Sequence, residues 1–314
     1  MTALILMYHR VAHPVQDAYG LSVAPDRFAS HVEHLRRLNC VVPLTEILRP
    51  TTSLQVAITF DDGYADNATQ AAPLLVEAGL PATYFITSGR LGGQHFWWDR
   101  LAAGVLRPPA GRTGIDVTVD GRDLWLALDD EGACRASLRF LHRRLRPLPP
   151  DELLATVAEV LQTLQAPEPP VDASSMTVDQ LVALSRLPLV EIGAHTRTHL
   201  QLGGQTPALQ RSEVIGSLMD LSGLLGKSVT SFAYPFGSEL AIGDLAPRLA
   251  REAGCVLACS TERAPVTPSS DPHRLPRLNV ENWDVSEFAA QLQSLAGGGQ
   301  ARSHGVRRRW KGRL

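Results

Sequence analysis

The sequence predicts an α/β protein built on parallel strands. Short apolar runs, such as 3–8, 56–60 and 82–87, alternate with amphipathic stretches that have the spacing of helices. Continuous apolar runs of this length are typical of strands buried on both faces, and strands separated by helices indicate a parallel sheet or barrel. Further candidate strands are 190–194, 229–234 and 254–260.

Helices are expected between these strands. Asp26 can cap a helix whose apolar residues, from Phe28 to Leu38, recur on one face. A second helix is predicted over 67–78 and a third around 177–185. Their positions between apolar runs support parallel strand–helix–strand units.

Residues 90–175 interrupt this alternation. They contain the aromatic run 96–99 and two helical stretches separated by a proline-rich segment at 147–150. We expect one domain over 1–296 that carries this segment as an insertion. A basic tail over 297–314, which starts with three glycines, follows it.

Composition excludes several classes of protein. The 314 residues include 30 basic and 32 acidic side chains, a formal charge of −2, so no nucleic-acid partner is expected. Four cysteines in a chain of this length do not form a disulfide framework. The first ten residues lack the basic start of a signal peptide, and no stretch has the roughly 18 apolar residues of a membrane span. The expected location is cytoplasmic.

The tail concentrates positive charge. Its basic residues are Arg302, Arg307, Arg308, Arg309, Lys311 and Arg313, and it has no acidic residue. Near an anionic lipid surface each such charge contributes about 1 kcal/mol, which would allow peripheral contact with the inner face of the membrane. A solubilising, disordered end explains the same composition.

Polar clusters directly follow predicted strands. They are His9, Asp61–Gly63, His195–His199 and Tyr234–Gly237. Because the carboxyl ends of parallel strands converge on one face of an α/β protein, these four clusters are expected to lie on one rim, where sites are built.

His195 and His199 have a spacing suited to one metal ion. Histidines four apart share one face of a helix, and a turn after a strand could also bring them together. One of Asp61 and Asp62 would add a carboxylate ligand while the other acts on the metal's water. Without such partners, the histidines would be surface or capping residues and Asp-Asp-Gly would be a turn.

Together, these segments resemble the motifs of the polysaccharide deacetylases, the NodB-homology or carbohydrate esterase 4 family. The first two family motifs would be Thr59–Gly63 and His195–His199. Other family-like segments are 176–181, 191–195 and 232–237. The resemblance covers 1–90 and 175–285, and it implies a distorted (β/α)7 barrel with a helical insertion and one divalent metal ion.

The resemblance also implies roles for individual residues. Asp62, His195 and His199 would be the metal ligands, and Asp61 would be the general base. The expected metal is Zn²⁺, although Co²⁺, Ni²⁺ and Fe²⁺ suit similar geometry.

The third family motif, usually Arg-x-Pro-Tyr-Gly, is altered. Ala233 and Phe236 stand where the family has Arg and Tyr. Tyr234 and Phe236 are expected at the substrate, and the backbone N–H of Phe236 could stabilise an oxyanion because that role needs no side chain. Arg277 could replace the missing Arg in orienting Asp61; a surface ion pair is the alternative for Arg277.

The family's carboxy-terminal Leu-x-His motif, which supplies the general acid, is absent after residue 280. The segment Leu6–Val11 resembles a family branch in which this strand stands at the amino end. His9 is therefore the expected general acid, with a capping or core histidine as the alternative.

Trp98 and Asp99, at the start of the insertion, are expected to bind the sugar. An aromatic face packs on the C–H groups of a sugar, and a carboxylate binds its hydroxyls. The alternative is that the tryptophans belong to the hydrophobic core.

These roles predict a metal-dependent deacetylase with a carbohydrate substrate. It would remove the N-acetyl (N-acyl) group of an amino sugar in a glycan or a lipid-linked saccharide. An O-acetyl esterase acting on a polysaccharide and a catalytically silent carbohydrate-binding protein of the same fold are the alternatives. The complete set of Asp61, Asp62, His195 and His199 argues against a silent protein, whereas Ala233 leaves it open.

Overall fold

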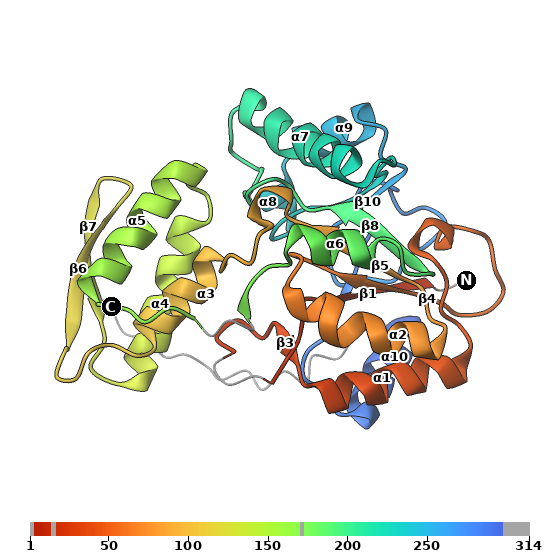
Figure 1. Ribbon diagram of the computed structural model, residues 1–314, viewed down its shortest axis with the longest axis horizontal. Helices are drawn as coiled ribbons and strands as arrows, with labels where there is room; N and C mark the ends of the chain where they lie inside the picture. Colours follow the sequence, from red (N-terminus) through yellow and green to blue (C-terminus); the bar gives the residue numbers. More distant parts are fainter. Residues whose placement is uncertain (1–2, 14–16, 170–172, 298–314) are drawn as a thin grey trace.

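A curled sheet of parallel strands forms the centre of the computed structural model, which describes residues 3–13, 17–169 and 173–297. In chain order the strands are β1 (Ala3–Tyr8), β4 (Gln55–Phe60), β5 (Ala82–Ile86), β8 (Val190–Ala194), β9 (Ser231–Ala233), β10 (Leu257–Cys259) and β11 (Leu278–Asn279). Their order in the sheet is β10-β9-β8-β5-β4-β1-β11, and every neighbouring pair is parallel (Figure 1). This confirms the predicted α/β class.

The two edges of the sheet approach each other. Leu275, shortly before β11, forms an isolated parallel bridge with Cys259 in β10. The segment 275–279 therefore contacts both β1 and β10, as in a distorted barrel. The strands β9 and β10 are shorter than the apolar runs that predicted them.

Both faces of the central strands are buried, as their continuous apolar sequences predict. In β1, Leu4 and Leu6 pack in the hydrophobic cluster under the helices, whereas Ile5 belongs to a second cluster on the opposite face of the sheet. In β4, Ile58 likewise packs in the cluster under the helices, and Ala57 belongs to the second cluster on the opposite face.

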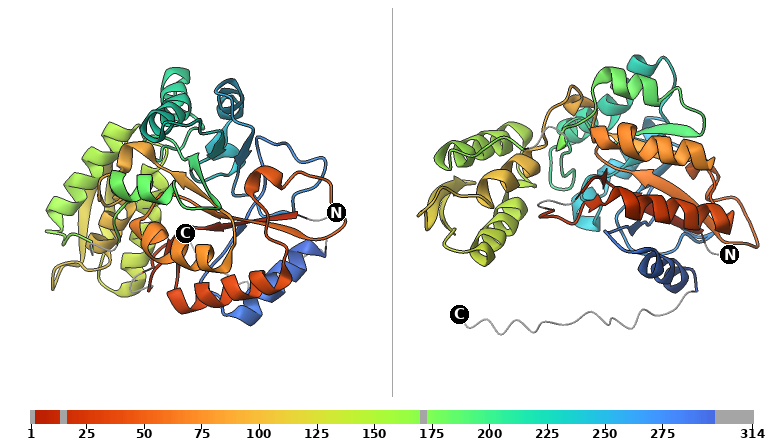
Figure 2. Two further views of the ribbon diagram at one scale, coloured as in Figure 1. Left: turned by 45° about the vertical axis from the view of Figure 1, so that its right-hand side comes forward. Right: turned by 60° about the horizontal axis from the view of Figure 1, so that its bottom comes forward.

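Helices cover the outside of the curled sheet. They are α1 (Pro25–Leu38), α2 (Ala72–Ala78), α6 (Val178–Leu184), α7 (Pro207–Leu225), α8 (Glu239–Ile242), α9 (Leu245–Glu252) and α10 (Val285–Ala296). The helices α1, α2 and α10 lie along one side, and α7 and α9 lie along the other (Figures 1 and 2). Shorter elements are the π-helical turn Asn67–Ala71 before α2, the 3-10 turns Leu44–Glu46 and Ser88–Arg90, and the small strands β2 (Arg10–Val11) and β3 (Ser22–Val23).

The expected cap of α1 is wrong. The helix begins at Pro25, and Ala24 occupies the N-cap position without a side-chain hydrogen bond. Proline fits the first helical position because the amide there needs no intrahelical partner. Asp26 lies in the first turn instead, where its charge favours the helix dipole.

The insertion forms a lobe beside the barrel (Figure 2). Its elements are α3 (Trp97–Val105), β6 (Gly114–Val119), β7 (Arg122–Ala127), α4 (Glu131–Leu145) and α5 (Pro150–Thr163). They enclose a hydrophobic cluster of their own, which also takes in Tyr64 and packs against Phe236 from the barrel loops. The antiparallel hairpin β6–β7 was not among the predicted elements.

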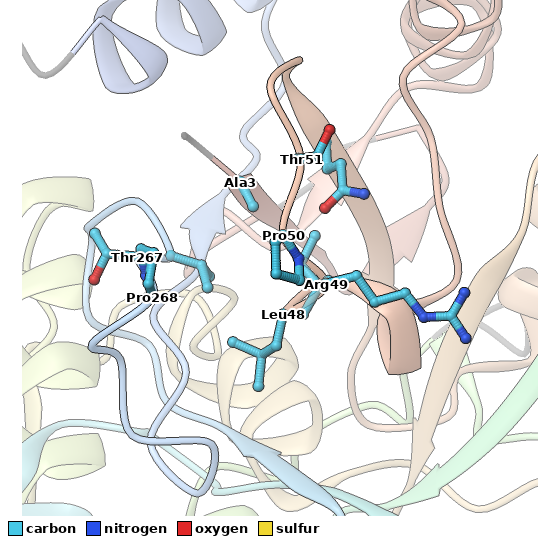
Figure 3. A pocket seen from close by; sticks show the side chains of 10 residues that line it. Ala3, Leu48, Arg49, Pro50, Thr51, Thr267 and Pro268 are labelled. Carbon is cyan, nitrogen blue, oxygen red and sulfur yellow. The ribbon is translucent and has the colours of Figure 1, made fainter.

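A cavity of about 90 Å³ lies between residues 47–51 and 266–268 (Figure 3). Ala3 and Gln55, the first residues of β1 and β4, line it. It therefore opens at the amino ends of the strands, away from the rim where the polar clusters follow the carboxyl ends.

Among the described residues, no helix combines the length and the apolar character needed to cross a membrane. All the basic residues of the predicted tail lie outside the described residues. The single domain over 1–296 stays a prediction.

Candidate active site

The polar residues that end β4 and β8 are held by the hydrogen bonds of the sheet. The N–H of Asp61 donates to the carbonyl of Tyr8 at 2.9 Å, and the N–H of His195 donates to the carbonyl of Ile86 at 2.9 Å. Each residue thus extends the strand ladder by one position. Their side chains meet at the carboxyl end of the barrel.

Asp62, His195 and His199 converge there. Each offers a ligand atom that lies within 4.8 Å of the other two, and all three residues are buried. The Nε2 atoms of His195 and His199 lie 3.4 and 3.2 Å from Oδ1 of Asp62. Ligands about 2.0–2.1 Å from a tetrahedral zinc ion are separated by about 3.3 Å, so the spacing suits such an ion.

The polar atoms of this group also fit a cation. Oδ1 of Asp62 is buried and has no hydrogen-bond partner in the described part of the chain. His195 donates its Nδ1–H to the carbonyl of Ala233 at 2.8 Å, which leaves the lone pair of Nε2 directed towards Asp62. A neutral imidazole fixed in this tautomer is the form that ligates metal ions.

Electrostatics favour the same protonation states. Burial raises the pKa of Asp62, but the two imidazoles outweigh burial and the net pKa lies well below its usual value. Burial lowers the pKa of His199 in spite of the nearby Asp62 carboxylate. An ionised carboxylate and a neutral histidine are what a divalent metal requires.

A turn, and not a helix, brings the two histidines together. Thr196 and His199 have φ values of 61° and 62°, in the left-handed region. The turn is held by the buried Glu213 of α7, whose Oε2 accepts the N–H of Arg197 at 2.8 Å and of Thr198 at 2.9 Å. Of the two geometries open for His195 and His199, the structure has the turn after a strand.

Left-handed backbone recurs at this rim. Asp62 has φ 75° and Phe236 has φ 62°, like the two residues of the histidine turn. Such conformations cost a non-glycine residue of order 1–3 kcal/mol and cluster at functional sites. These outliers therefore point to a functional rim.

Asp61 is paired with Arg277 as expected. Nη1 and Nη2 of Arg277 each donate to one carboxylate oxygen of Asp61 at 2.7 Å, and Arg277 is fully buried. The guanidinium also donates to Oγ1 of Thr59 at 3.2 Å and to the carbonyl of Ser260 at 2.8 Å. The alternative of a surface ion pair is wrong because no part of Arg277 reaches solvent.

The pairing sets the charge of Asp61. Burial raises the pKa of its carboxyl, but the adjacent Arg277 guanidinium outweighs burial and the net pKa is lowered. Asp61 is therefore ionised at neutral pH and able to accept a proton.

His9 follows β1 on the same rim. Its Nδ1 is buried and finds no hydrogen-bond acceptor or donor within the described ranges, and its carbonyl accepts Nδ2 of Asn67 at 2.7 Å. The imidazole lies close enough to favour the charged forms of Asp61 and Asp62. His9 thus has a ring nitrogen without a partner in the described part of the chain, next to Asp61 and Asp62.

Phe236 lies over the group of Asp62, His195 and His199, the candidate metal site, whereas Tyr234 does not. The ring of Phe236 meets that of His199 edge-on, with centroids 4.9 Å apart, and its N–H donates to no acceptor among the residues described. Tyr234 is fully buried and its hydroxyl donates to the carbonyl of His273 at 3.0 Å. The expectation that the Tyr234 side chain binds substrate is therefore wrong, because that side chain belongs to the core.

Trp98 and Asp99 belong to a buried network that the sequence did not reveal. Nε1 of Trp98 donates to the hydroxyl of Tyr64 at 2.8 Å, and this hydroxyl donates to Oδ2 of Asp99 at 2.7 Å. The Trp98 ring lies 4.5 Å from that of His199 and is only 3% exposed. Trp98 therefore forms a wall of the candidate metal site. Burial raises the pKa of Asp99 to about 7.

Further side chains of the insertion reach the site. His142 of α4 lies 4.9 Å from Tyr19 and 5.9 Å from Phe236 between ring centroids. Trp97 stacks on His142 with ring centroids 5.1 Å apart and belongs to the core. No local motif marks His142 or Tyr19, because only the packing of the insertion against the barrel brings them here.

This combination defines a class of protein. A parallel α/β barrel that holds two histidines and a carboxylate at its carboxyl rim, next to a second, ionised carboxylate, has the form of a hydrolytic metal centre. A family model described as polysaccharide deacetylase matches residues 49–132 and 171–258. The chain belongs to the polysaccharide deacetylase family, whose members are carbohydrate deacetylases and hence hydrolases.

Individual relatives agree. The curated protein YxkH of Bacillus subtilis, whose name assigns it provisionally to the polysaccharide deacetylases, is 33% identical over 93% of this chain and 76% of its own length. The Streptococcus pyogenes deacetylase PplD in complex with acetate has a TM-score of 0.60 at 16% identity, over 93% of this chain and 98% of its own. A de-N-acetylase from Aggregatibacter actinomycetemcomitans has a TM-score of 0.56 at 16% identity, over 93% and 100%. The two structures show the same fold.

Proposed function

We propose that the protein is a metal-dependent deacetylase that removes the N-acetyl (N-acyl) group of an amino sugar in a glycan or a lipid-linked saccharide. The observation that carries this proposal is the buried group of Asp62, His195 and His199 beside the Arg277-bound Asp61. The fold shared with a de-N-acetylase supports the choice of an amide substrate.

In this mechanism each rim residue has one task. A divalent cation bound by Asp62, His195 and His199 would supply polarisation of the acyl oxygen and a lowered pKa of a water molecule. Asp61 accepts the proton of the attacking water, and Arg277 holds its carboxylate in place.

The remaining roles concern the acyl oxygen and the leaving group. The N–H of Phe236 donates to the acyl oxygen as negative charge develops there. His9 protonates the departing amine, which is a poor leaving group without a proton. The products are a free amino sugar and acetate, or formate if the acyl group is formyl.

The test is acetate release from matched N-acetylated and O-acetylated sugars by chelated protein, before and after Zn²⁺ is added. Metal-restored release from the amide substrate is the expected result. Acetate release from the ester alone would favour the O-acetyl esterase. Acetate release at the same rate with and without the metal would overturn the site assignment. Parallel reconstitution with Co²⁺, Ni²⁺ and Fe²⁺ identifies the metal that supports the highest rate.

A silent carbohydrate-binding protein is the second candidate, because Ala233 replaces an Arg of the family motif. Binding of metal and sugar without acetate release from any acetylated substrate would support it. The Arg277–Asp61 pair argues against it, since the guanidinium is supplied from another strand.

The cytoplasmic location is also part of the proposal. All four cysteines are unpaired, which suits a reducing compartment. Vesicle flotation of the full chain, compared with a chain ending at residue 297, tests contact of the basic tail with anionic lipid.

A further inference from the structure

Arg146, directly after α4, lies at the edge of the candidate active site. Its guanidinium carbon is 5.5 Å from the ring centroid of Phe236, and that ring lies 4.9 Å from the ring of His199. The side chain is half-buried. A cation thus stands one aromatic ring away from the proposed metal ligands.

The protein does not neutralise this cation. Two other half-buried arginines have carboxylate partners: Arg10 pairs with Asp66 at 3.0 Å, and Arg197 pairs with Asp220 at 2.7 Å. No carboxylate in the described part of the chain forms an ion pair with Arg146. Partial burial of an unpaired charge is unfavourable, so the guanidinium is suited to an anion that arrives with a ligand.

A second unpartnered donor lies in the same aromatic group. The hydroxyl of Tyr19 is buried and has no hydrogen-bond partner among the residues that the structure describes. Its ring lies 4.9 Å from His142, whose own ring faces Phe236. Arg146 is close enough to His142 to act on its charged form. Tyr19 therefore contacts the His142 ring and Arg146 contacts the Phe236 ring, and the centroids of these two rings lie 5.9 Å apart.

We propose that Arg146 and Tyr19 form a subsite for an anionic group, a phosphate or a carboxylate, carried by the sugar whose acyl group lies at the metal site. This inference rests on the proposed function, because it names the substrate class of that site. Guanidinium and hydroxyl donors match the oxygens of such an anion. The guanidinium carbon lies 5.5 Å from the Phe236 ring centroid, within the range of a cation–π contact, which helps to hold the guanidinium beside the site.

Three N-acetylated substrates test the subsite: the methyl glycoside of N-acetylglucosamine, N-acetylglucosamine 1-phosphate, and a methyl glycoside of an N-acetylated amino-uronic acid. The wild type should have a higher kcat/KM for an anionic substrate than for the neutral one. Preference for the phosphate or for the uronate identifies which anion the subsite takes. Equal values for all three substrates would overturn the proposal.

Variants locate the effect. Arg146→Gln should lower the ratio of anionic to neutral kcat/KM about tenfold to 100-fold, the range expected for hydrogen bonds to a charged group. Tyr19→Phe should lower the same ratio by about fivefold. Arg143→Gln is the matched control, because Arg143 is exposed at the end of α4. An Arg146→Gln ratio equal to that of the control would overturn the proposal.

A binding experiment separates this inference from the proposed function. Calorimetry with N-acetylglucosamine 1-phosphate should give a Kd that rises at least tenfold in Arg146→Gln. If no substrate releases acetate but this difference remains, the subsite stands and the proposed function fails. If acetate is released without any anion preference and the Kd is unchanged, the proposed function stands and the subsite fails. Circular dichroism confirms that each variant is folded.

Discussion

Arg277 donates two hydrogen bonds of 2.7 Å to the two carboxylate oxygens of Asp61, although the residues are 216 positions apart in the chain. At Ala233, where the family motif usually has Arg, the backbone carbonyl instead accepts Nδ1–H of His195. The guanidinium that holds the Asp61 carboxylate thus comes from the segment before β11 and not from the end of β9. The altered third motif therefore leaves Asp61 fully paired.

Loss of Arg277 should destabilise the protein strongly. Arg277→Ala leaves the buried charge of Asp61 unpaired, which costs about 3–5 kcal/mol in the free energy of unfolding. Arg211→Ala is the matched control, because Arg211 and Glu252 form an exposed pair, which contributes little to stability. Urea unfolding measures both. Equal losses in the two variants would contradict the importance of the buried pair.

Asp61→Asn should retain the metal and lose the reaction. The amide preserves most of the shape of the side chain but is unable to accept the proton of water, so kcat should fall by about 10²- to 10⁴-fold. Metal content, measured by elemental analysis after dialysis, should equal that of the wild type. If acetate release is unchanged, Asp61 is not the base.

Asp62→Asn should show the opposite pattern, because Asp62 contributes the carboxylate of the candidate metal site. A ligand that binds only the folded state raises stability according to its concentration over Kd. Added Zn²⁺ should therefore raise the Tm of the wild type and leave that of Asp62→Asn nearly unchanged. An equal shift in both proteins would place the metal elsewhere.

His9→Gln should affect amides more than activated esters. An amine needs a proton to leave, whereas 4-nitrophenolate leaves without one, so loss of a general acid affects only the first reaction. We expect kcat/KM to fall by about 10²-fold or more for an N-acetyl sugar and by less than about fivefold for 4-nitrophenyl acetate. Equal falls for the two substrates would assign His9 to binding or folding.

His31 should make stability depend on pH. It is fully buried between Tyr8 and Phe288, its Nε2–H donates to the carbonyl of Trp283 at 3.0 Å, and burial lowers its pKa from 6.5 to about 4. Between about pH 6.5 and pH 4 the unfolded chain therefore binds a proton that the folded chain does not. Stability due to this group is present above pH 6.5 and is lost as pH falls towards 4.

Urea unfolding from pH 7 to pH 4 checks this dependence on pH. Wild type should lose more stability over this range than His31→Gln, which has no titratable group at the position. Parallel curves for the two proteins would show that His31 titrates alike in the folded and unfolded states.

Local patterns in the sequence were sufficient to predict the rim. Strands buried on both faces have continuous apolar sequences, and the polar residues that follow them, such as Asp62 and His195, are fixed by the ladder at known ends. For Arg277 the sequence left two equal alternatives: the family resemblance lacked a guanidinium at Ala233, so Arg277 could replace it from another strand end or form a surface ion pair, and only the structure decides between them.

Two kinds of feature were not predicted from the sequence. The hairpin β6–β7 had a local signal that was missed, since Asp120 and Gly121 form a two-residue turn with φ values of 52° and 66° between alternating apolar residues. By contrast, Tyr64 and His142 have no such signal. Their positions depend on how the insertion packs against the barrel.

The left-handed residues at the rim have a consequence for variation and selection. Asp62, His199 and Phe236 adopt a backbone conformation in which glycine is comfortable and their own side chains are not. In the presence of a chelator, a screen that rewards heat resistance alone should therefore enrich glycine or asparagine at Asp62 and His199, and the enriched proteins should be inactive, whereas the packing of Phe236 against the insertion should retain the aromatic ring. Screens that also demand turnover would find their thermal gains elsewhere in the chain.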